Sequence, residues 1–322
     1  MPSQTQAPLV LVSDIGGTNT RVALARGSRV DAATVTRFRN ADHSGLPSVL
    51  QTYLSQQGDP SLAGTCVAVA GPVRDGRATL TNLDWTIDNA TLSGATGTGR
   101  VAILNDLQAQ GHALGHLSDT ALTTVIDGAT PPQGDTQLVI GMGTGFNAAV
   151  VHDDGPSRLV TASESGHVTM PVRHDDHLRL ARFVERIHGF AAVEDVLSGR
   201  GLTHIHDWLS AEAGQSGTKT SAEILDQAAS DPLAERAVRI FTPLFGAVAG
   251  DLALVHLPFG GVHLVGGMAR AILPWMAPCG FAQAFHDKGR FSDFMHGFRV
   301  SVVEDDYAAL TGCACHLAGH PT

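Results

Sequence analysis

Two segments of this chain share one pattern, in which an apolar run stops at glycines and a threonine and then resumes. The first is LVSDIGGTNTRVALA, from Leu11 to Ala25, and the second is TQLVIGMGTGFNAAVVHDD, which begins at Thr136. Polar and apolar residues alternate after the glycines, so each turn is predicted to join two strands of a β-hairpin. A dinucleotide fold or a P-loop has a helix at this point instead. Two copies of the pattern predict two structurally similar halves.

The glycine turns are suited to bind an anion. Exposed backbone N–H groups in a tight turn, with Thr18 and Asn19 as further donors, can hold a phosphate, and glycine lets the backbone approach a ligand closely. Asp14 stands beside the first turn and could hold a divalent ion, since magnesium prefers carboxylate and phosphate oxygens. An ordinary hairpin turn with a solvated aspartate would contain the same residues, so this stretch alone leaves both interpretations open.

The length and net charge of the chain limit the number of domains and the kinds of partner that we expect. The chain of 322 residues is long enough for one large or two medium domains. Its net charge of −10 argues against nucleic acid or an anionic membrane as the main partner. MPSQTQAP has no basic region followed by an apolar one, so we expect no signal peptide, and we expect no membrane-spanning segment. Only four cysteines are present, which fits a cytoplasmic protein.

Lysine is nearly absent from the chain, which contains only Lys219 and Lys288. A P-loop or a protein-kinase site needs a lysine on the phosphates. The segment GQSGTKT at 214–220 has the wrong spacing for a P-loop and follows no apolar strand. If this protein handles nucleoside triphosphates, it must use backbone N–H groups and a metal ion.

Apolar runs and helical periodicity predict alternating strands and helices. The segment FAAVEDVLSGRGL is predicted to be a helix that stops at Gly199 or Gly201. Strand groups separated by helices indicate an α/β protein with two sheet-centred domains, whose facing glycine turns would form a small-molecule site. We expect strands at 8–14, 20–26, 29–37 and 157–162, and helices at 45–56 and 233–256.

Seven segments, in order and over nearly the whole chain, resemble those of the bacterial glucokinase family of the non-ROK type. DIGGTNTR and GMGTGFN resemble its two phosphate loops. LTNLDW, LND, ESGHV and VEDVLSGRGL resemble its sugar-contacting segments, and GGVHLVGG resembles the segment near the adenosine. The segment HDKGRF then follows in the expected order. One glycine motif alone is weak evidence, whereas seven at plausible spacing are a specific match.

The resemblance implies the two-lobed actin-like (ribonuclease H-like) ATPase fold. Each lobe would be a mixed β-sheet with flanking helices, with the active site in the interlobe cleft. The small lobe would comprise 1–116 plus 304–322, and the large lobe 117–303. The implied reaction is the ATP-dependent phosphorylation of D-glucose at its 6-hydroxyl with release of ADP, by a cytoplasmic homodimer that uses Mg²⁺.

The resemblance also implies roles for individual residues. Asp106 would be the general base, although by itself it would more often be the N-cap of the helix that follows. Asp14 would bind Mg²⁺, directly or through water. The sugar would be bound by Asn105, Asp106, Glu164, His167 and Glu194. ATP would be bound by Ser13, Asp14, Ile15, Gly16, Gly17, Thr18, Gly143, Thr144, Gly145, Gly266 and Gly267.

The spacing of Glu164 and His167 could also suit a metal ion. Sugar contact is favoured because no cysteine cluster follows His167, and this difference also separates the chain from the ROK kinases, which carry a cysteine-rich zinc motif there.

Three residues depart from the family pattern: Asn147 and Ser165 stand where glycine is usual, and Arg200 stands where proline is common. None of them removes an implied contact residue. Ser165 bears most directly on which sugar fits, so a kinase for fructose, mannose or an amino sugar stays an alternative. A non-catalytic sugar-binding regulator is a weaker alternative, because such a protein is expected to have lost Asp106.

Overall fold

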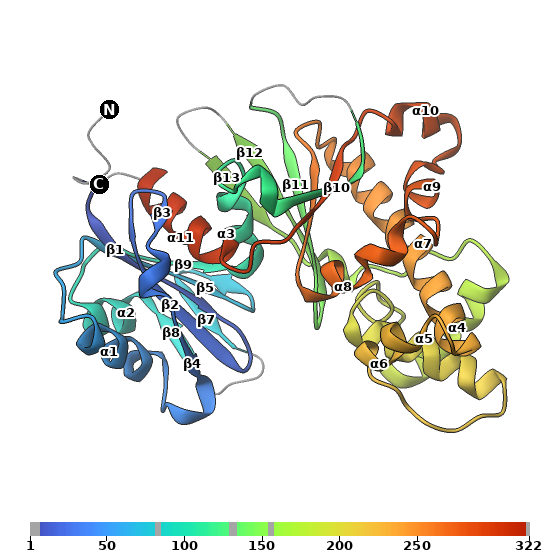
Figure 1. The fold of residues 1–322 in the computed structure, drawn as a ribbon, viewed down its shortest axis with the longest axis horizontal. Coiled ribbons are helices and arrows are strands. Elements are labelled where there is room, and N and C mark those ends of the chain that lie inside the picture. Colours follow the sequence, from blue (N-terminus) through green and yellow to red (C-terminus); the bar gives the residue numbers. More distant parts are fainter. Residues whose placement is uncertain (1–6, 81–84, 129–133, 154–157, 320–322) are drawn as a thin grey trace. The chain divides into compact units, whose positions relative to one another are not determined.

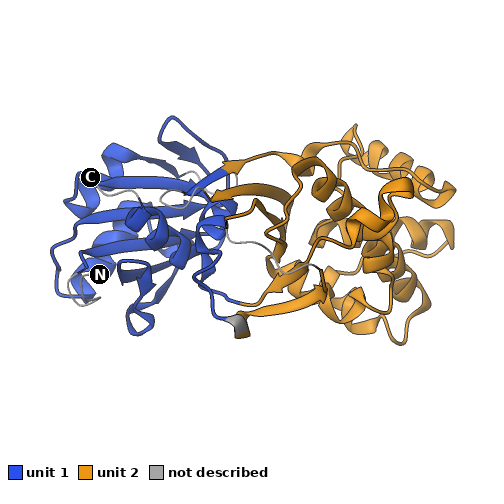
Figure 2. Ribbon diagram, turned by 90° about the horizontal axis from the view of Figure 1, so that it is seen from above, with its two compact units in different colours: residues 1–118, 154–160, 305–322 blue, residues 119–153, 161–304 orange. Residues whose placement is uncertain are grey.

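The structure is a computed structural model that describes residues 7–80, 85–128, 134–153 and 158–319. The chain forms two compact units (Figure 2). Unit 1 comprises residues 1–118, 154–160 and 305–322, and unit 2 comprises residues 119–153 and 161–304. Residues 158–160 therefore group with unit 1, whereas the sequence analysis assigned them to the larger domain.

Unit 1 is built on a sheet with the strand order β3-β2-β1-β5-β9, in which β4 also pairs with β2 (Figure 1). The hairpin predicted around the first glycine turn is present, since β1 and β2 are antiparallel neighbours. Strands β1, β5 and β9 are parallel to one another. The strands are β1 (Leu9–Ile15), β2 (Asn19–Arg26), β3 (Arg29–Val30), β4 (Thr36–Arg39), β5 (Gly64–Val69) and β9 (Val101–Asn105).

The single strand expected at 29–37 is divided in two. Asp31 accepts a hydrogen bond from the N–H of Ala33 and so caps a 3₁₀ helix over Ala32–Thr34. A smaller antiparallel sheet also belongs to unit 1, and it consists of β6 (Val73–Arg74), β7 (Arg77–Thr79) and β8 (Thr86–Asp88).

Helices cover both faces of the unit 1 sheet. Tyr53 of α1 and Leu92 of α2 belong to the hydrophobic cluster on one face, and Leu310 of α11 belongs to the cluster on the other. The small residues of α11 allow close packing, since a Cβ at Gly312 would lie 1.6 Å from the carbonyl oxygen of Ala109 in α3. The helices are α1 (Leu46–Gln56), α2 (Asn89–Thr96), α3 (Asp106–Ala113) and α11 (Ala308–Gly319).

The second large sheet has the strand order β10-β15-β14-β11-β12-β13, and apart from residues 158–160 of β13 it belongs to unit 2. It again contains an antiparallel hairpin, β11–β12, which is continued by parallel strands β14 and β15. This repeats the arrangement of β2, β1, β5 and β9, so the predicted similarity of the two halves is confirmed at the level of topology. The strands are β10 (Leu122–Ile126), β11 (Gln137–Met142), β12 (Phe146–Asp153), β13 (Arg158–Ala162), β14 (Val262–Val265) and β15 (Val300–Val303).

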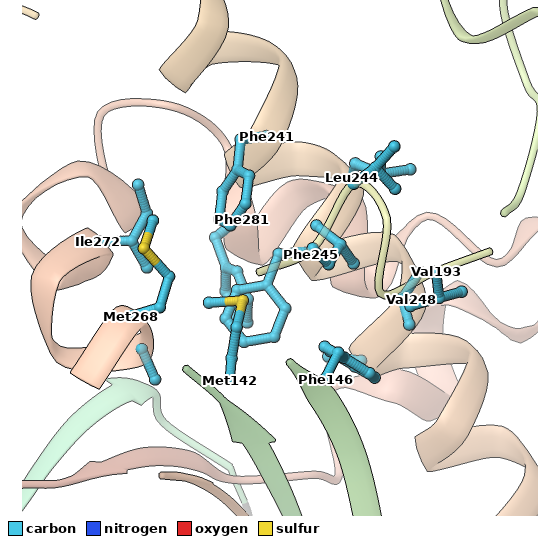
Figure 3. Packing of buried hydrophobic residues seen from close by; sticks show 14 of the residues in the cluster. Met142, Phe146, Val193, Phe241, Leu244, Phe245, Val248, Met268, Ile272 and Phe281 are labelled. Atoms are coloured by element: carbon cyan, nitrogen blue, oxygen red, sulfur yellow. The ribbon is translucent and has the colours of Figure 1, made fainter. Parts of the chain in front are cut away.

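The core of unit 2 is organised around helix α7. The ring of Phe245 in α7 lies between Phe146 of β12 and Phe281 of α9, with centroid distances of 6.3 and 5.2 Å (Figure 3). The helices are α4 (Asp175–His188), α5 (Gly199–Glu212), α6 (Ser221–Gln227), α7 (Pro232–His256), α8 (Gly267–Met276), α9 (Phe281–His286) and α10 (Ser292–Met295).

Helix α7 was not expected to have the length and composition of a membrane span, but it does. Of its most apolar window, 61% is buried inside the protein, as in the core helices of soluble proteins. Its apolar character is therefore explained by the packing of unit 2.

The helix predicted for FAAVEDVLSGRGL is wrong. Helix α5 begins at Gly199 instead of ending there, and the residues before it form turns. The hydroxyl of Ser198 accepts a hydrogen bond from the N–H of Gly201 (3.0 Å), which makes Ser198 the N-cap of α5. The sequence pattern was apolar enough for a helix before Gly199, but the hydrogen bond of Ser198 shows that the helix begins there. This places Glu194 in a turn, where it contacts the second glycine turn.

Candidate functional site

The first glycine turn connects β1 and β2 and is held by a buried amide. The N–H of Gly16 donates to the carbonyl of Asn19 (3.0 Å) and closes the turn. The side chain of Asn40, which is 2% exposed, donates to the carbonyl of Gly16 (2.8 Å) and accepts from the hydroxyl of Thr20 (2.8 Å). Thr18 at the tip is exposed. The turn is thus accessible at its tip and anchored at its base.

Two residues expected at the ATP site, Ser13 and Ile15, have fully buried side chains. The hydroxyl of Ser13 donates to the carbonyl of Arg21 (2.9 Å), and Ile15 belongs to the hydrophobic core of unit 1. These two side chains therefore support the turn from the core.

Asp14 and Asp106 lie at the same edge of the unit 1 sheet. Strands β1, β5 and β9 are parallel and in register up to their last residues, which are Ile15, Val69 and Asn105. Because Asp14 precedes the first of these residues and Asp106 follows the last, the two carboxyl groups come from the ends of two strands, β1 and β9, that are separated by β5. Carboxyl ends of parallel strands are where open α/β sheets bind their ligands.

Both carboxyl groups have a raised pKa. Burial is the main cause for Asp14, and the Arg21 guanidinium, whose Nη1 lies 3.4 Å from Oδ2, opposes it. Burial also raises the pKa of Asp106 to about 6; the N–H of Leu107 opposes this rise, and the charge of Asp14 adds to it. A carboxylate with a pKa close to neutral is suited to take up a proton during a reaction.

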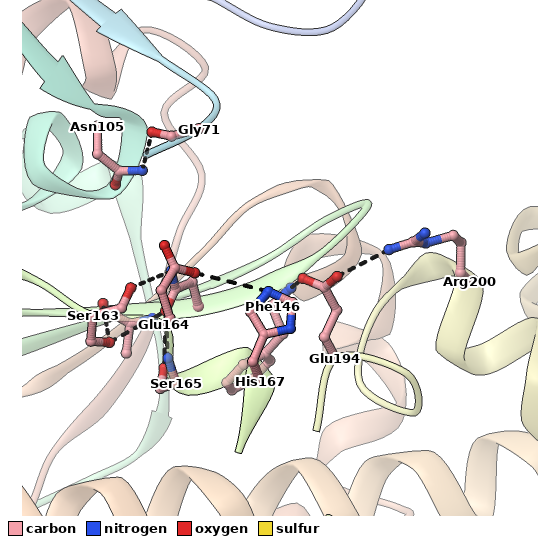
Figure 4. A network of polar contacts seen from close by, with 11 residues as sticks. Gly71, Asn105, Phe146, Ser163, Glu164, Ser165, His167, Glu194 and Arg200 are labelled. Atoms are coloured by element: carbon pink, nitrogen blue, oxygen red, sulfur yellow. Dashed lines mark hydrogen bonds and ion pairs between the residues drawn. The ribbon is translucent and has the colours of Figure 1, made fainter. Parts of the chain in front are cut away.

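Asn105, and not Asp106, is the N-cap of α3. Its Oδ1 accepts from the N–H of Leu107 (2.9 Å), and the side chain of Gln108 accepts from the N–H of Asn105 (3.1 Å), which completes a capping box. Its Nδ2 also donates to the carbonyl of Gly71 (3.1 Å; Figure 4). The interpretation of Asp106 as the helix cap is therefore wrong. The amide expected to bind sugar keeps one N–H beyond these contacts.

The second glycine turn connects β11 and β12 and is tied to the start of α5. The N–H of Gly143 donates to the carbonyl of Gly145 (2.9 Å), and the N–H of Gly199 donates to the carbonyl of Gly143 (2.8 Å). Thr144 at the tip is exposed, like Thr18 in unit 1. A Cβ at position 145 would lie 2.4 Å from a carboxylate oxygen of Glu194, so a larger residue there would displace this carboxylate from its present position.

Gly266 and Gly267 lie where β14 meets α8, beside the second glycine turn. Gly266 has a φ of +102°, and a Cβ there would lie 2.5 Å from the carbonyl oxygen of Met142, the last residue of β11. Both observations require glycine at this position. Unit 2 thus brings the segment expected at the adenosine next to the turn expected at the phosphates.

Three predicted sugar contacts, Glu164, His167 and Glu194, lie close together in unit 2 (Figure 4). The N–H of Glu194 donates to the carbonyl of Gly166 (2.8 Å), which joins its turn to the short 3₁₀ helix that contains His167. Nε2 of His167 is 4.0 Å from Oε2 of Glu164, and more than 60% of each of these two side chains is exposed.

Glu194 differs from these neighbours because its carboxylate is occupied by donors. Oε2 accepts from the N–H of Phe146 (2.9 Å), and Oε1 lies 3.0 Å from Nη2 of Arg200 (Figure 4). Only 20% of its side chain is exposed. Glu194 therefore connects the second glycine turn to the predicted sugar contacts.

Comparison with known proteins decides the family. A sequence model of the glucokinase family matches residues 11–320. The chain belongs to the glucokinase family. A glucokinase from Marinobacter nauticus is 33% identical to it over 309 residues, which cover 94% of this chain and 95% of the relative.

Solved structures agree with this family. A glucokinase from an Antarctic psychrotroph has a TM-score of 0.87 at 29% identity, covering 98% of this chain and 100% of its own. A glucokinase from Balamuthia mandrillaris in complex with glucose has a TM-score of 0.80 at 21% identity, covering 97% of this chain and 94% of its own, and this likeness shows the fold. The predicted α/β kinase fold with two sheets is confirmed. So is the enzyme class: the protein is a glucokinase-family phosphotransferase that phosphorylates glucose with ATP.

Sequence reasoning gave no role to Arg21 and Asn40, which hold the first glycine turn. Arg21 is the last residue of the DIGGTNTR motif and faces Asp14 in the hairpin register, so strand pairing could have indicated the contact. Asn40 is 24 residues away from Gly16, and no local pattern connects the two.

In the part of the chain that the structure describes, the site contains neither a metal-binding cluster nor a free lysine. Within the described ranges, no group of three or more His, Cys, Asp and Glu side chains is arranged to hold a metal ion. Lys219 forms an ion pair with Asp231, and Lys288 forms one with Asp251, so both lysines have structural partners. Residues 81–84 of the LTNLDW segment lie outside the described residues.

Proposed function

We propose that Asp106 is the general base of glucose phosphorylation. The observation that carries this proposal is the carboxyl group at the end of β9, whose pKa is raised to about 6 by burial and by Asp14. Above that pH the group is ionised and can accept a proton. A positioned base contributes on the order of 10²–10⁴-fold in rate.

In the proposed reaction the 6-hydroxyl oxygen of the sugar attacks the γ-phosphorus of ATP. The hydroxyl proton passes to the carboxylate of Asp106, a new oxygen–phosphorus bond forms, and the bond from the γ-phosphorus to the bridging oxygen of ADP breaks. The transferred group carries most of its charge on peripheral oxygens, so positioning and charge stabilisation dominate catalysis.

The two glycine turns are proposed to bind the phosphates through backbone N–H groups. Residues Gly16 to Thr18 and residues Gly143 to Gly145 supply these turns, and Gly266 and Gly267 leave room for the nucleoside. This fits the shortage of lysine, because neither Lys219 nor Lys288 is available for a phosphate.

Mg²⁺ is proposed to arrive with ATP and to be held by Asp14. The described residues offer one carboxylate here and no three-ligand cluster, which suits an ion that keeps several waters and binds phosphate oxygens. The charge of Asp14 lies near that of Asp106, so a cation would relieve their repulsion. The ion would supply neutralisation of the phosphate charge.

Sugar recognition is proposed to fall to Asn105, Asp106, Glu164, His167 and Glu194. Their amide, carboxylate and imidazole groups can each donate to or accept from a hydroxyl. A site built on such groups rejects a sugar that lacks a hydroxyl, because a buried polar group is then left unpaired.

We also propose that the protein is a cytoplasmic homodimer. Support for the dimer comes from the family resemblance alone, and light scattering after gel filtration tests it. Support for the compartment comes from the use of ATP and from the four cysteines, which are all free.

The experiment for this function is ADP release from purified protein with magnesium-ATP and a panel of sugars. Glucose, mannose, fructose, glucosamine and N-acetylglucosamine are compared with a blank without sugar. We expect by far the highest kcat/KM for glucose. A higher value for another hexose would keep Asp106 as the base but transfer the specificity to that sugar, and no stimulation by any sugar would contradict the proposal.

A further inference from the structure

Asn147, the second residue of β12, lies at the centre of a hydrogen-bond network around Glu164 (Figure 4). Its Nδ2 donates to Oε2 of Glu164 (3.2 Å) and to the carbonyl of Ser163. Its Oδ1 accepts from the N–H of Ser165 (2.9 Å) and from the hydroxyl of Ser165 (3.1 Å). One amide thus contacts the first two residues of the ESGHV segment, Glu164 and Ser165, and the residue before them, Ser163.

The chemistry of the partners fixes the orientation of this amide. The backbone N–H groups of Ser165 and Ala148 can only donate, so the oxygen of Asn147 must face them. The carbonyl of Ser163 and the carboxylate of Glu164 can only accept, so the nitrogen must face these two. If the amide were flipped, its nitrogen would face the N–H groups of Ser165 and Ala148. Its oxygen would then face the carboxylate of Glu164.

Glu164 is otherwise weakly restrained. Its side chain is 62% exposed, and the nearest other charged group is the His167 ring, with Nε2 4.0 Å from Oε2. Within the described residues, Asn147 and His167 both approach the carboxylate at Oε2, which leaves Oε1 open to a ligand. An exposed glutamate that must find one rotamer to bind a hydroxyl loses conformational entropy on binding. A fixed donor on Oε2 reduces that loss before the sugar arrives.

We infer that Asn147 is a positioning residue that sets the sugar preference of this enzyme by fixing Glu164, and that Ser165 acts through Asn147. This inference rests on the proposed role of Glu164 as a sugar contact. Asn147 and Ser165 are two of the three departures from the family pattern, and they contact each other. Asn147 and Ser165 therefore act together on the position of Glu164, and through it on the sugar hydroxyl that Glu164 binds.

The test measures kcat/KM for glucose and for a set of glucose analogues that each lack one hydroxyl. The variants are Asn147→Ala, Asn147→Asp, Ser165→Ala and the double Asn147→Ala/Ser165→Ala. The matched control is Gln215→Ala, which removes an amide from an exposed loop of unit 2. Thermal unfolding of each variant is recorded beside the kinetics.

We expect Asn147→Ala to lower kcat/KM for glucose about three- to tenfold, mainly through KM. One deoxy analogue lacks the hydroxyl that Glu164 binds, and for this analogue Asn147→Ala should have the same kcat/KM as the wild type. The ratio of kcat/KM for glucose to kcat/KM for this analogue should therefore fall by the same three- to tenfold factor. Asn147→Asp keeps the acceptor for Ser165 but places a carboxylate against Glu164, so its loss should be at least as large.

Ser165→Ala should have a smaller effect, and the double variant should match Asn147→Ala, because Ser165 acts only through the amide. An equal loss for every sugar, or no loss in Asn147→Ala, would overturn the inference. Additive losses in the double variant would overturn the role given to Ser165. Calorimetric binding of glucose and of the analogues gives the same comparison without turnover. If the wild type binds sugar but releases no ADP, the proposed catalytic role of Asp106 is contradicted. The calorimetric affinities of the Asn147 variants would still show whether Asn147 sets the sugar preference.

Discussion

The carboxyl groups proposed for catalysis in unit 1 and those proposed for recognition in unit 2 have opposite surroundings. Asp106 lies in a partly buried position near the like charge of Asp14, and the backbone N–H of Leu107 donates to its Oδ1 (2.9 Å). Glu194 in unit 2 has a donor on each oxygen, from Phe146 and Arg200, and Glu164 has the amide of Asn147. The two units carry similar hairpins and similar turns, so the difference lies in what surrounds the acids.

This difference indicates two uses of the same functional group. Burial beside a like charge raises the proton affinity of Asp106, which a general base needs. Donors on both oxygens fix the direction in which Glu194 can accept a further hydrogen bond, which recognition of a hydroxyl needs. We therefore expect substitutions in unit 1 to change turnover and its pH dependence, and substitutions in unit 2 to change KM and sugar discrimination.

The largest expected effect comes from Asp106→Asn. The amide keeps the shape of the side chain and can still accept from the N–H of Leu107, but it cannot take up the proton of the sugar hydroxyl. The kcat for glucose should fall on the order of 10²–10⁴-fold, whereas glucose affinity by calorimetry should change far less. A kcat within tenfold of the wild type would remove Asp106 from the mechanism.

Glu194→Ala should have the next largest effect, in unit 2. The change removes a proposed sugar acceptor and leaves the N–H of Phe146 without its partner, so kcat/KM for glucose should fall about 10- to 100-fold. Glu185→Ala is the matched control, since Glu185 is an exposed glutamate on α4. If both variants behaved alike, Glu194 would have no part in recognition.

The raised pKa of Asp106 in unit 1 should also make the free energy of unfolding depend on pH. The folded-state pKa of Asp106 is raised from 3.8 to about 6, so its ionisation above pH 6 destabilises the fold. Asp106→Asn should therefore raise the free energy of unfolding at pH 8 by about 1–3 kcal/mol. The difference should disappear at about pH 2.5, well below the unfolded-state pKa of 3.8, where the aspartate is protonated in both states. Urea unfolding at the two pH values tests this, and an equal or lower stability of the variant at pH 8 would contradict it.

Arg200→Ala should have the smallest effect. The ion pair with Glu194 is exposed on the arginine side, where 65% of the side chain is accessible, and such pairs contribute about 0.2–1 kcal/mol. KM for glucose should rise by at most about fivefold, with kcat retained. A loss as large as that of Glu194→Ala would show that Arg200 itself contacts a substrate.

Much of the fold was predictable from local pattern. The two hairpins and their repetition follow from alternation around Gly17 and Gly143, because strand periodicity is a short-range signal. The helix boundary at Gly199 was missed because an apolar turn and an apolar helix look alike in sequence, and the Ser198 cap decides between them only through its hydrogen bond.

The contacts around the site were less accessible to sequence reasoning. The positions of Asp14 and Asp106 at strand ends were predictable, but their common edge depends on the strand order β1-β5-β9, which pairs segments far apart in the chain. Likewise, Asn147 and Ser165 were noted as separate departures, and their contact depends on the fold of η5 (Ser165–His167) against β12.

The most direct test of the comparison is the pH dependence of kcat/KM for glucose between pH 5 and 8, in the wild type and in Asp14→Asn. The account predicts a fall of tenfold per pH unit below an apparent pKa near 6 in the wild type. In Asp14→Asn the like charge is absent, so the apparent pKa of this acidic limb of the profile should be lower than in the wild type, whatever the absolute value of kcat/KM. His167→Gln serves as the control and should retain the limb. A flat profile, a limb that disappears in His167→Gln, or a limb that stays in place in Asp14→Asn would contradict the tuning of Asp106 by its surroundings.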